Sequence, residues 1–138
     1  MDQSEKIRAN AEMVIQQLRP LSGMDFGYNA ESVHWLQGYL ERLRPEENFE
    51  ARKEKFSSVF GSFLGECIIR CHGGHWDTRD GMTCIVFDDQ NAAYPFNKIK
   101  KQLDNGLEDG IASFFDTIPI LFEAQPPLRP RKPWWKIW

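Results

Sequence analysis

The chain has 138 residues, of which 41% are hydrophobic and 27% charged, and its formal net charge is −3. A chain of this length can bury a core without disulfides or metals, but it is too short for separate catalytic and cofactor domains. The cysteine count is odd, the first residues do not resemble a signal peptide, and no run of about 18 apolar residues occurs. We therefore expect a cytoplasmic protein with no integral membrane segment.

The charge is unevenly distributed along the chain. Residues 1–125 hold all 20 acidic residues and 13 basic ones, a net charge of −7, whereas residues 126–138 carry +4 and three of the five tryptophans. Four prolines in the first eight residues of this C-terminal segment favour an extended conformation. We predict one domain over residues 1–125 and a proline-rich, basic, aromatic tail over residues 126–138.

Two amphipathic helices are predicted near the N-terminus. Apolar residues at helical spacing indicate the first over residues 4–18, with Ser4 as the N-cap and Pro20 as the stop. A second helix is predicted to begin after the N-cap Asn29 and to end before Pro45.

The third predicted helix has the most regular pattern. Apolar side chains recur every three or four residues over residues 56–71, and Gly73-Gly74 supplies a C-terminal stop. Cys67 and Cys71 belong to this stripe, so we expect both thiols in the core. Gly61 and Gly65 lie one turn apart and predict a face for close packing against a neighbouring element.

A small antiparallel meander is predicted after the glycines, because the hydrophobic period changes there. Strands are expected over residues 75–78 and 82–87, joined by a turn that contains Asp80-Gly81, and a third strand over residues 92–96. Acidic residues are frequent in the turns of this region, where Asp is favoured for backbone reasons.

Helices are predicted again in the C-terminal part. A short helix is expected over residues 97–103, followed by a last helix from about Leu107 that Pro119 should kink or split. The fold class is therefore α+β: a helical N-terminal half of three helices, a small antiparallel β-meander and C-terminal helices.

Cysteines and histidines near the end of the third helix are of the types that bind zinc or form a catalytic dyad. Their spacing places two of the cysteines on one helix face rather than at a turn, and no motif marks a third catalytic group or an oxyanion site. We expect metal-free cysteines and no cofactor. The alternative is a small Cys/His-dependent enzyme or a metal-binding protein, which would use Cys71, His72, His75 and Glu66.

A series of short motifs resembles a known family. The motifs are Gly61-x-Phe63-Leu64-Gly65-Glu66, Arg70, Gly73-Gly74-x-Trp76, Tyr94-Pro95-Phe96-x-Lys98-Ile99-x-Lys101-x-Leu103-x-Asn105-Gly106 and Asp109-x-Ile111-x-x-Phe114. In this order, over about residues 29–116, they resemble the bacterial family called domain of unknown function 3806. The resemblance implies a bacterial cytosolic protein and brings no established activity, site or cofactor.

Three charged residues in these motifs are candidate functional positions. Glu66 and Arg70 lie four residues apart on the third helix and can form an ion pair on one face, and Lys98 lies in the predicted short helix. A charged side chain whose surroundings are specific is either paired for structural reasons or used in function.

The charge pattern leads to the functional expectation. Residues 59–125 contain ten acidic and five basic residues, and such a surface repels nucleic acid and attracts basic proteins. We expect a non-enzymatic protein that binds a basic protein, for example a toxin or effector, in the manner of an immunity protein or antitoxin. The expected partner-binding residues are Asp77, Asp80, Asp88, Asp89, Trp134 and Trp135.

The tail leaves three alternatives open. Exposed tryptophans beside arginine and lysine are typical of binding anchors, so the tail can dock on a partner protein. It can also lie at a membrane interface, with tryptophans among the headgroups. Its positive charge equally suits folding back onto the acidic body, in the same molecule or in a second copy.

Overall fold

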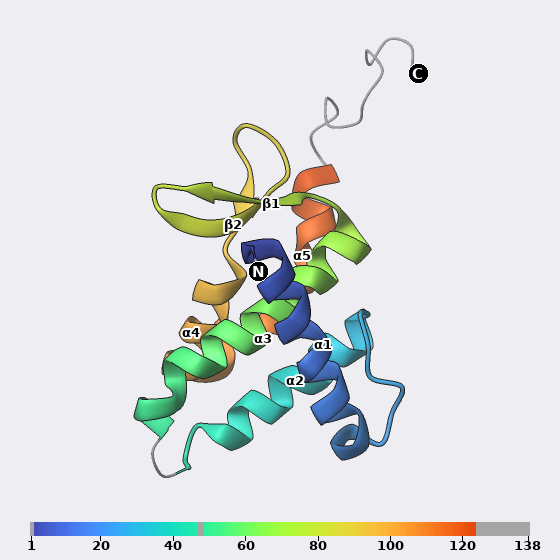
Figure 1. Cartoon of the computed structure of the whole chain (residues 1–138), viewed down its shortest axis with the longest axis vertical. Helices are drawn as coiled ribbons and strands as arrows, with labels where there is room; N and C mark the ends of the chain where they lie inside the picture. Colours follow the sequence, from blue (N-terminus) through green and yellow to red (C-terminus); the bar gives the residue numbers. More distant parts are fainter. Residues whose placement is uncertain (1, 47–48, 124–138) are drawn as a thin grey trace.

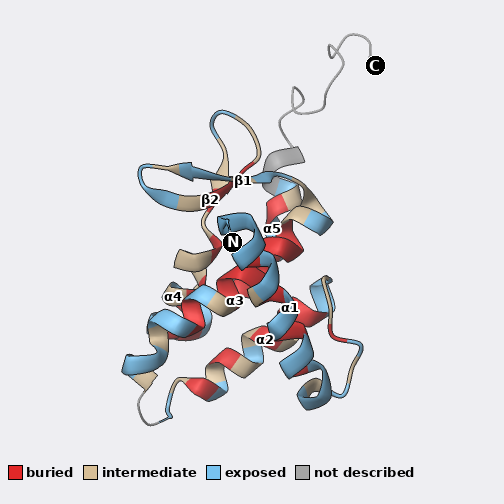
Figure 2. Cartoon of the chain, in the orientation of Figure 1, coloured by how far each residue is buried: buried red, intermediate tan, exposed pale blue. Residues whose placement is uncertain are grey.

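The N-terminal half contains three helices, and the first two pack against the third. The computed structural model of the chain describes residues 2–46 and 49–123. Its first helices are α1 (Gln3–Ser22), α2 (Ala30–Leu43) and α3 (Phe49–His72). The middle of α3 is buried on all sides, from Phe60 to Ile68, and Figure 2 shows the buried residues along α3 and on the faces that surround it. α3 is therefore the central helix of the core.

The ends of α1 differ from the prediction. Its N-cap is Asp2 rather than Ser4, because the Asp2 carboxylate accepts the Glu5 N–H at 2.9 Å and the Glu5 carboxylate accepts the Asp2 N–H in return. Pro20 does not stop the helix. The chain continues to Gly23, whose φ of 68° and N–H bond to the Arg19 carbonyl form the C-cap.

The predicted start of α2 is confirmed. The Asn29 side chain accepts a hydrogen bond from the Ser32 N–H at 2.8 Å, and the helix ends at Leu43, before Pro45. The predicted stop of α3 is confirmed too, since α3 ends at His72 and both following glycines have positive φ.

A three-stranded antiparallel sheet follows α3. Its strands are β1 (His75–Arg79), β2 (Met82–Val86) and β3 (Ala92–Ala93), in that order. The predicted hairpin turn is confirmed, with Asp80 and Gly81 both at positive φ as a type I′ turn requires. β3 is shorter than predicted because Pro95 begins the next helix, where its fixed φ and missing N–H are tolerated.

The last elements are α4 (Pro95–Asn105), the 3₁₀ helix η1 (Gly106–Asp109) and α5 (Ile111–Glu123). The final helix starts at Ile111, later than predicted, because η1 precedes it. Pro119 lies within α5 and does not split it. Ile111, Phe115 and Ile118 are buried on one face of this helix. α4 packs against α3, and α5 packs against α2. Figure 1 shows the β-hairpin and the loop after β2 at the end of the molecule where α5 also ends. The described residues thus form the predicted α+β arrangement.

Candidate functional site

The close-packing glycines of α3 bring two aromatic rings onto it. A Cβ atom at Gly65 would lie 2.1 Å from the ring of Trp76, and one at Gly61 would lie 2.4 Å from the ring of Phe96. The predicted close-packing face is thus confirmed, and its partners are β1 and the start of α4. Only glycine leaves room for this approach.

Glu66 and Arg70, two of the three charged motif residues, form a cluster with Trp76. Glu66 is buried, with 6% of its surface exposed, and its two carboxylate oxygens are both used. Trp76 Nε1 donates to one oxygen at 2.8 Å and the Arg70 guanidinium donates to the other at 3.0 Å. The predicted Glu66–Arg70 pair is confirmed, and it satisfies a buried charge that would otherwise be costly.

The cluster extends to the loop before α2. The Arg70 guanidinium lies 3.9 Å from the centre of the Tyr28 ring, and the Tyr28 hydroxyl donates to the Glu12 carboxylate at 2.6 Å. Burial, followed by the hydrogen bond to Glu12, raises the pKa of Tyr28 above its ordinary value. These contacts connect α1, the 23–29 loop, α3 and β1, and they explain the cluster as a structural brace.

Lys98 has a comparable role in the C-terminal part. Its side chain is mostly buried, and its ammonium lies 3.6 Å from the Asp109 carboxylate and 5.6 Å from the centre of the Phe114 ring. The Asn105 side-chain amide also donates to Asp109 at 2.7 Å. This hydrogen bond, with the nearby positive charge of Lys98, lowers the pKa of Asp109. Lys98 thus holds α4 against η1 and α5.

The cysteines and histidines do not converge. Cys67 and Cys84 are buried, but Cys71 is exposed, which corrects its predicted core position: the last turn of α3 extends past the core. The His72 ring packs 4.4 Å from Phe115 on α5, whereas His75 is exposed beside Asp77 on β1. No group of three His, Cys, Asp or Glu residues within the described ranges could hold a metal ion.

The thiols are also poorly suited to ionise. Burial raises the pKa of Cys67, which lies in the core. Burial also raises the pKa of Cys71, although Cys71 lies at the edge of the core. The Cys71 thiol donates to the Tyr28 carbonyl at 3.7 Å. Since the thiolate is the nucleophile and the metal ligand, this geometry gives the Cys/His alternative no support.

The acidic residues of the meander lie on β1 and in the two turns that flank β2. Asp80 lies in the β1–β2 turn and Asp89 in the loop that follows β2, and both are exposed. Arg79 connects the two turns, because its guanidinium donates to the backbone carbonyls of Asp88 at 2.9 Å and Asp89 at 3.3 Å. Figure 1 shows the hairpin turn and the loop after β2 as two separate projections from the sheet.

Asp88 differs from its neighbours. Its carboxylate accepts the backbone N–H groups of Gln90 and Asn91 at 2.8 Å and the side-chain amide of Asn91 at 2.9 Å. These hydrogen bonds, that of the Asn91 side chain first, lower the pKa of Asp88. The carboxylate therefore closes the turn, and we interpret Asp88 as a structural residue.

Three of the predicted aspartates remain for contact with a partner, and we call Asp77, Asp80 and Asp89 the acidic turn surface. Within the described residues, the carboxylates of Asp80 and Asp89 make no hydrogen bond or ion pair. Asp77 is exposed on β1 and accepts only the N–H of Thr78, with His75 at 3.9 Å. Trp134 and Trp135 lie outside the described residues.

The sequence-based reasoning missed Tyr28, Glu12 and Arg79. The contacts of Tyr28 and Glu12 join separate elements of the fold, and Arg79 binds backbone carbonyls. No sequence motif indicates a long-range contact or a bond to a backbone carbonyl. The sequence could have indicated a role for Arg79, because a single basic residue among acidic turns can donate hydrogen bonds to the acceptors of those turns.

Comparison with known proteins adds no assignment. The chain matches no protein-family model, no curated protein and no solved structure. The resemblance to domain of unknown function 3806 therefore stays a prediction. In the part of the chain that the structure describes, no helix combines the length and apolar character needed to cross a bilayer.

Proposed function

We propose that this protein is not an enzyme and binds a basic protein partner through the acidic turn surface. The observation that carries the proposal is the position of Asp80 and Asp89 on two neighbouring turns that Arg79 connects. The bonds from Arg79 hold the backbone of the second turn near the first, so little backbone freedom is lost when a partner's cationic side chains bind the two carboxylates.

The charge of the whole body supports the same class of partner. Residues 1–125 carry a net charge of −7, which accelerates association with a positively charged protein and repels nucleic acid. Toxins and effectors that act on nucleic acids carry such positive charge. A small acidic protein can block one without any chemistry, so we propose an immunity or antitoxin-like role in the cytoplasm.

The tail supplies secondary anchors in this proposal. Trp134 and Trp135 are large aromatic residues among basic ones, the composition of interface hot spots. Removal of residues 126–138 should weaken partner binding and leave the midpoint of thermal unfolding unchanged. A large fall in that midpoint would instead indicate a tail packed on the body, in the same molecule or in a second copy.

The test is co-purification from the native host with two triple variants. The first combines Asp77→Asn, Asp80→Asn and Asp89→Asn; asparagine tolerates the positive φ of 52° at position 80, so the turn is kept. The control combines Glu31→Gln, Glu46→Gln and Glu108→Gln, which remove the same charge from exposed positions elsewhere.

The wild-type chain and the control should recover a stoichiometric basic protein, and the Asp-to-Asn variant should lose it. Equal loss of the partner by both variants would show that net charge, rather than the position of the three aspartates, determines binding. Recovery of no partner by the wild-type chain, even at low salt, would contradict the proposal.

A further inference from the structure

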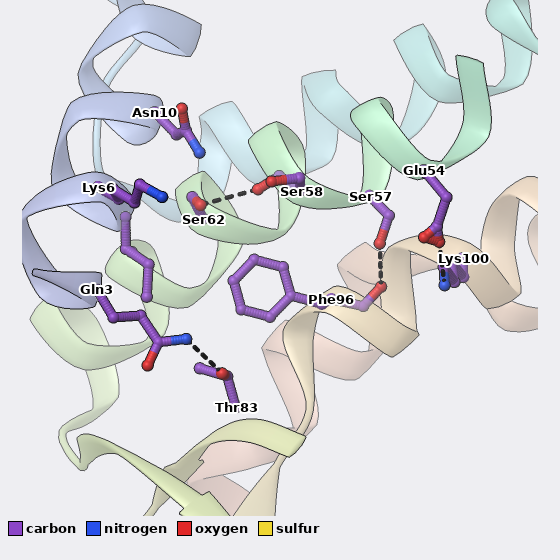
Figure 3. A pocket seen from close by; sticks show the side chains of 11 residues that line it. Gln3, Lys6, Asn10, Glu54, Ser57, Ser58, Ser62, Thr83, Phe96 and Lys100 are labelled. Atoms are coloured by element: carbon purple, nitrogen blue, oxygen red, sulfur yellow. Dashed lines mark hydrogen bonds and ion pairs between the residues drawn. The ribbon is translucent and has the colours of Figure 1, made fainter. Parts of the chain in front are cut away.

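A cavity lies between α1, α3, α4 and β2, and no residue of the acidic turn surface lines it. Its volume is about 360 Å³, within the range of small-molecule sites. Figure 3 shows the ring of Phe96 at its centre, with side chains of α1 and α3 around it. Eleven residues line the cavity, and most of them are polar.

Several of the polar groups in the cavity are already satisfied by the protein. The Ser57 hydroxyl donates to the Phe96 carbonyl at 2.9 Å, and the Ser62 hydroxyl donates to the Ser58 carbonyl at 2.8 Å. The Gln3 amide donates to the Thr83 hydroxyl at 2.7 Å, which joins α1 to β2. These bonds shape the walls.

Three side chains that line the cavity have donors without a protein partner. Within the described residues, the side chains of Lys6, Asn10 and Ser58 make no hydrogen bond or ion pair; Lys6 and Ser58 are exposed to solvent and Asn10 is half-buried. Figure 3 shows the side-chain nitrogens of Lys6 and Asn10 directed from α1 toward Ser62 and the Phe96 ring. Together these groups offer about six donor hydrogens, and no unused carboxylate opposes them.

The charge in the cavity is the reverse of the charge on the body. Its charged residues are Lys6, Lys100 and Glu54, and the last two form an ion pair at 2.5 Å. The lining therefore has a net charge of +1, with Lys6 unpaired. Phe96 is the second residue of α4, so the positive end of that helix dipole also lies at the cavity.

We propose that this cavity binds a small organic phosphate monoester. A ligand that matches a surplus of donors and positive charge must be rich in acceptors and anionic. A carboxylate offers only two oxygens, whereas a phosphate monoester offers three strongly accepting ones and carries more negative charge, which suits about six donors better. The Phe96 ring and the buried Ile7 side chain give the ligand's organic part an apolar wall.

The experiment is an NMR titration of the full ¹⁵N-labelled chain with methyl phosphate, and with acetate as a second probe. Saturable shifts are expected at the amides of Asn10, Ser58 and Ser62 with methyl phosphate, and weaker binding with acetate. Lys6→Gln should weaken methyl phosphate binding about tenfold or more, because it removes the unpaired charged donor.

The matched control is Lys101→Gln, which removes the same charge from an exposed position on α4 that does not line the cavity. It should leave the dissociation constant within about twofold, since salt screens a distant exposed charge. Absence of saturable shifts at these amides, equal effects of the two variants, or acetate binding as tight as methyl phosphate would each overturn the proposal. None of these results depends on the acidic turn surface.

Discussion

Trp76 Nε1 donates a 2.8 Å hydrogen bond to the buried carboxylate of Glu66, and this contact positions the start of the β-hairpin on α3. Successive side chains of a strand point to opposite faces, so holding Trp76 toward the core directs Asp77 outward. Trp76, which contacts the buried Glu66, and Asp77, which belongs to the acidic turn surface, are thus adjacent residues of β1.

The first prediction concerns the close approach of Trp76 to α3. Gly65→Ala should destabilise the fold by about 1–3 kcal/mol, because the added methyl group would overlap the indole ring. The control Gly38→Ala has open space around its Cβ position in α2 and should stabilise the fold by about 0.5–1 kcal/mol. Urea denaturation measures both, and effects of the same sign would contradict this packing.

The second prediction concerns the hydrogen bond itself. Trp76→Phe removes the indole donor and should cost about 1–3 kcal/mol, since the Glu66 oxygen stays buried without it. In the Glu66→Gln background, Trp76→Phe should lower the free energy of unfolding by less than it does in the wild-type chain. The reason is that a buried neutral amide is less costly to leave without a hydrogen bond than a buried carboxylate. A double-mutant cycle measures this coupling, and strictly additive effects would count against the brace.

The third prediction concerns the thiols. In the native protein a thiol reagent such as Ellman's reagent should label Cys71 alone and do so slowly, because burial raises its pKa. Cys67 and Cys84 should react only after unfolding. Cys71→Ser should abolish native-state labelling, and rapid reaction of a second thiol would contradict the burial of Cys67 on α3 or of Cys84 on β2.

The fourth prediction concerns pH. The pKa of Asp88 lies below its ordinary value in the folded protein, so the carboxylate stabilises the fold at neutral pH. That contribution is lost as pH falls below the unfolded-state pKa and through the lower folded-state one. Asn91→Ala should raise the pKa of Asp88, since the Asn91 side chain is the largest cause of the shift.

The control for this titration is Gln90→Ala. Gln90 donates to Asp88 through its backbone N–H, so loss of its side chain should leave the pKa of Asp88 unchanged. Carboxyl ¹³C chemical shifts report the titration directly. An unchanged pKa in Asn91→Ala would show that the backbone N–H groups alone hold the carboxylate.

Local signals predicted much of the fold. The Asn29 cap, the glycine stop after α3 and the turn at Asp80-Gly81 each depend on interactions within a few residues, and all three are confirmed. Pro20 misled the prediction because Gly23 provides the actual cap, and the reciprocal bonds of Asp2 and Glu5 outcompete Ser4.

The candidate site was less predictable. The pattern predicted the Glu66–Arg70 pair, which lies on one helix, but the Trp76 and Tyr28 contacts depend on how separate elements pack. Asp88 was grouped with the exposed aspartates because composition cannot distinguish a carboxylate that closes a turn from one that faces solvent.

The association rate of the co-purified partner, measured by stopped flow at low and high salt, tests binding through the acidic turn surface. We expect the variant with Asp77→Asn, Asp80→Asn and Asp89→Asn to associate about tenfold or more slowly than wild type at low salt, and the difference to shrink at high salt. Association as fast as that of wild type at low salt would contradict binding through the acidic turn surface.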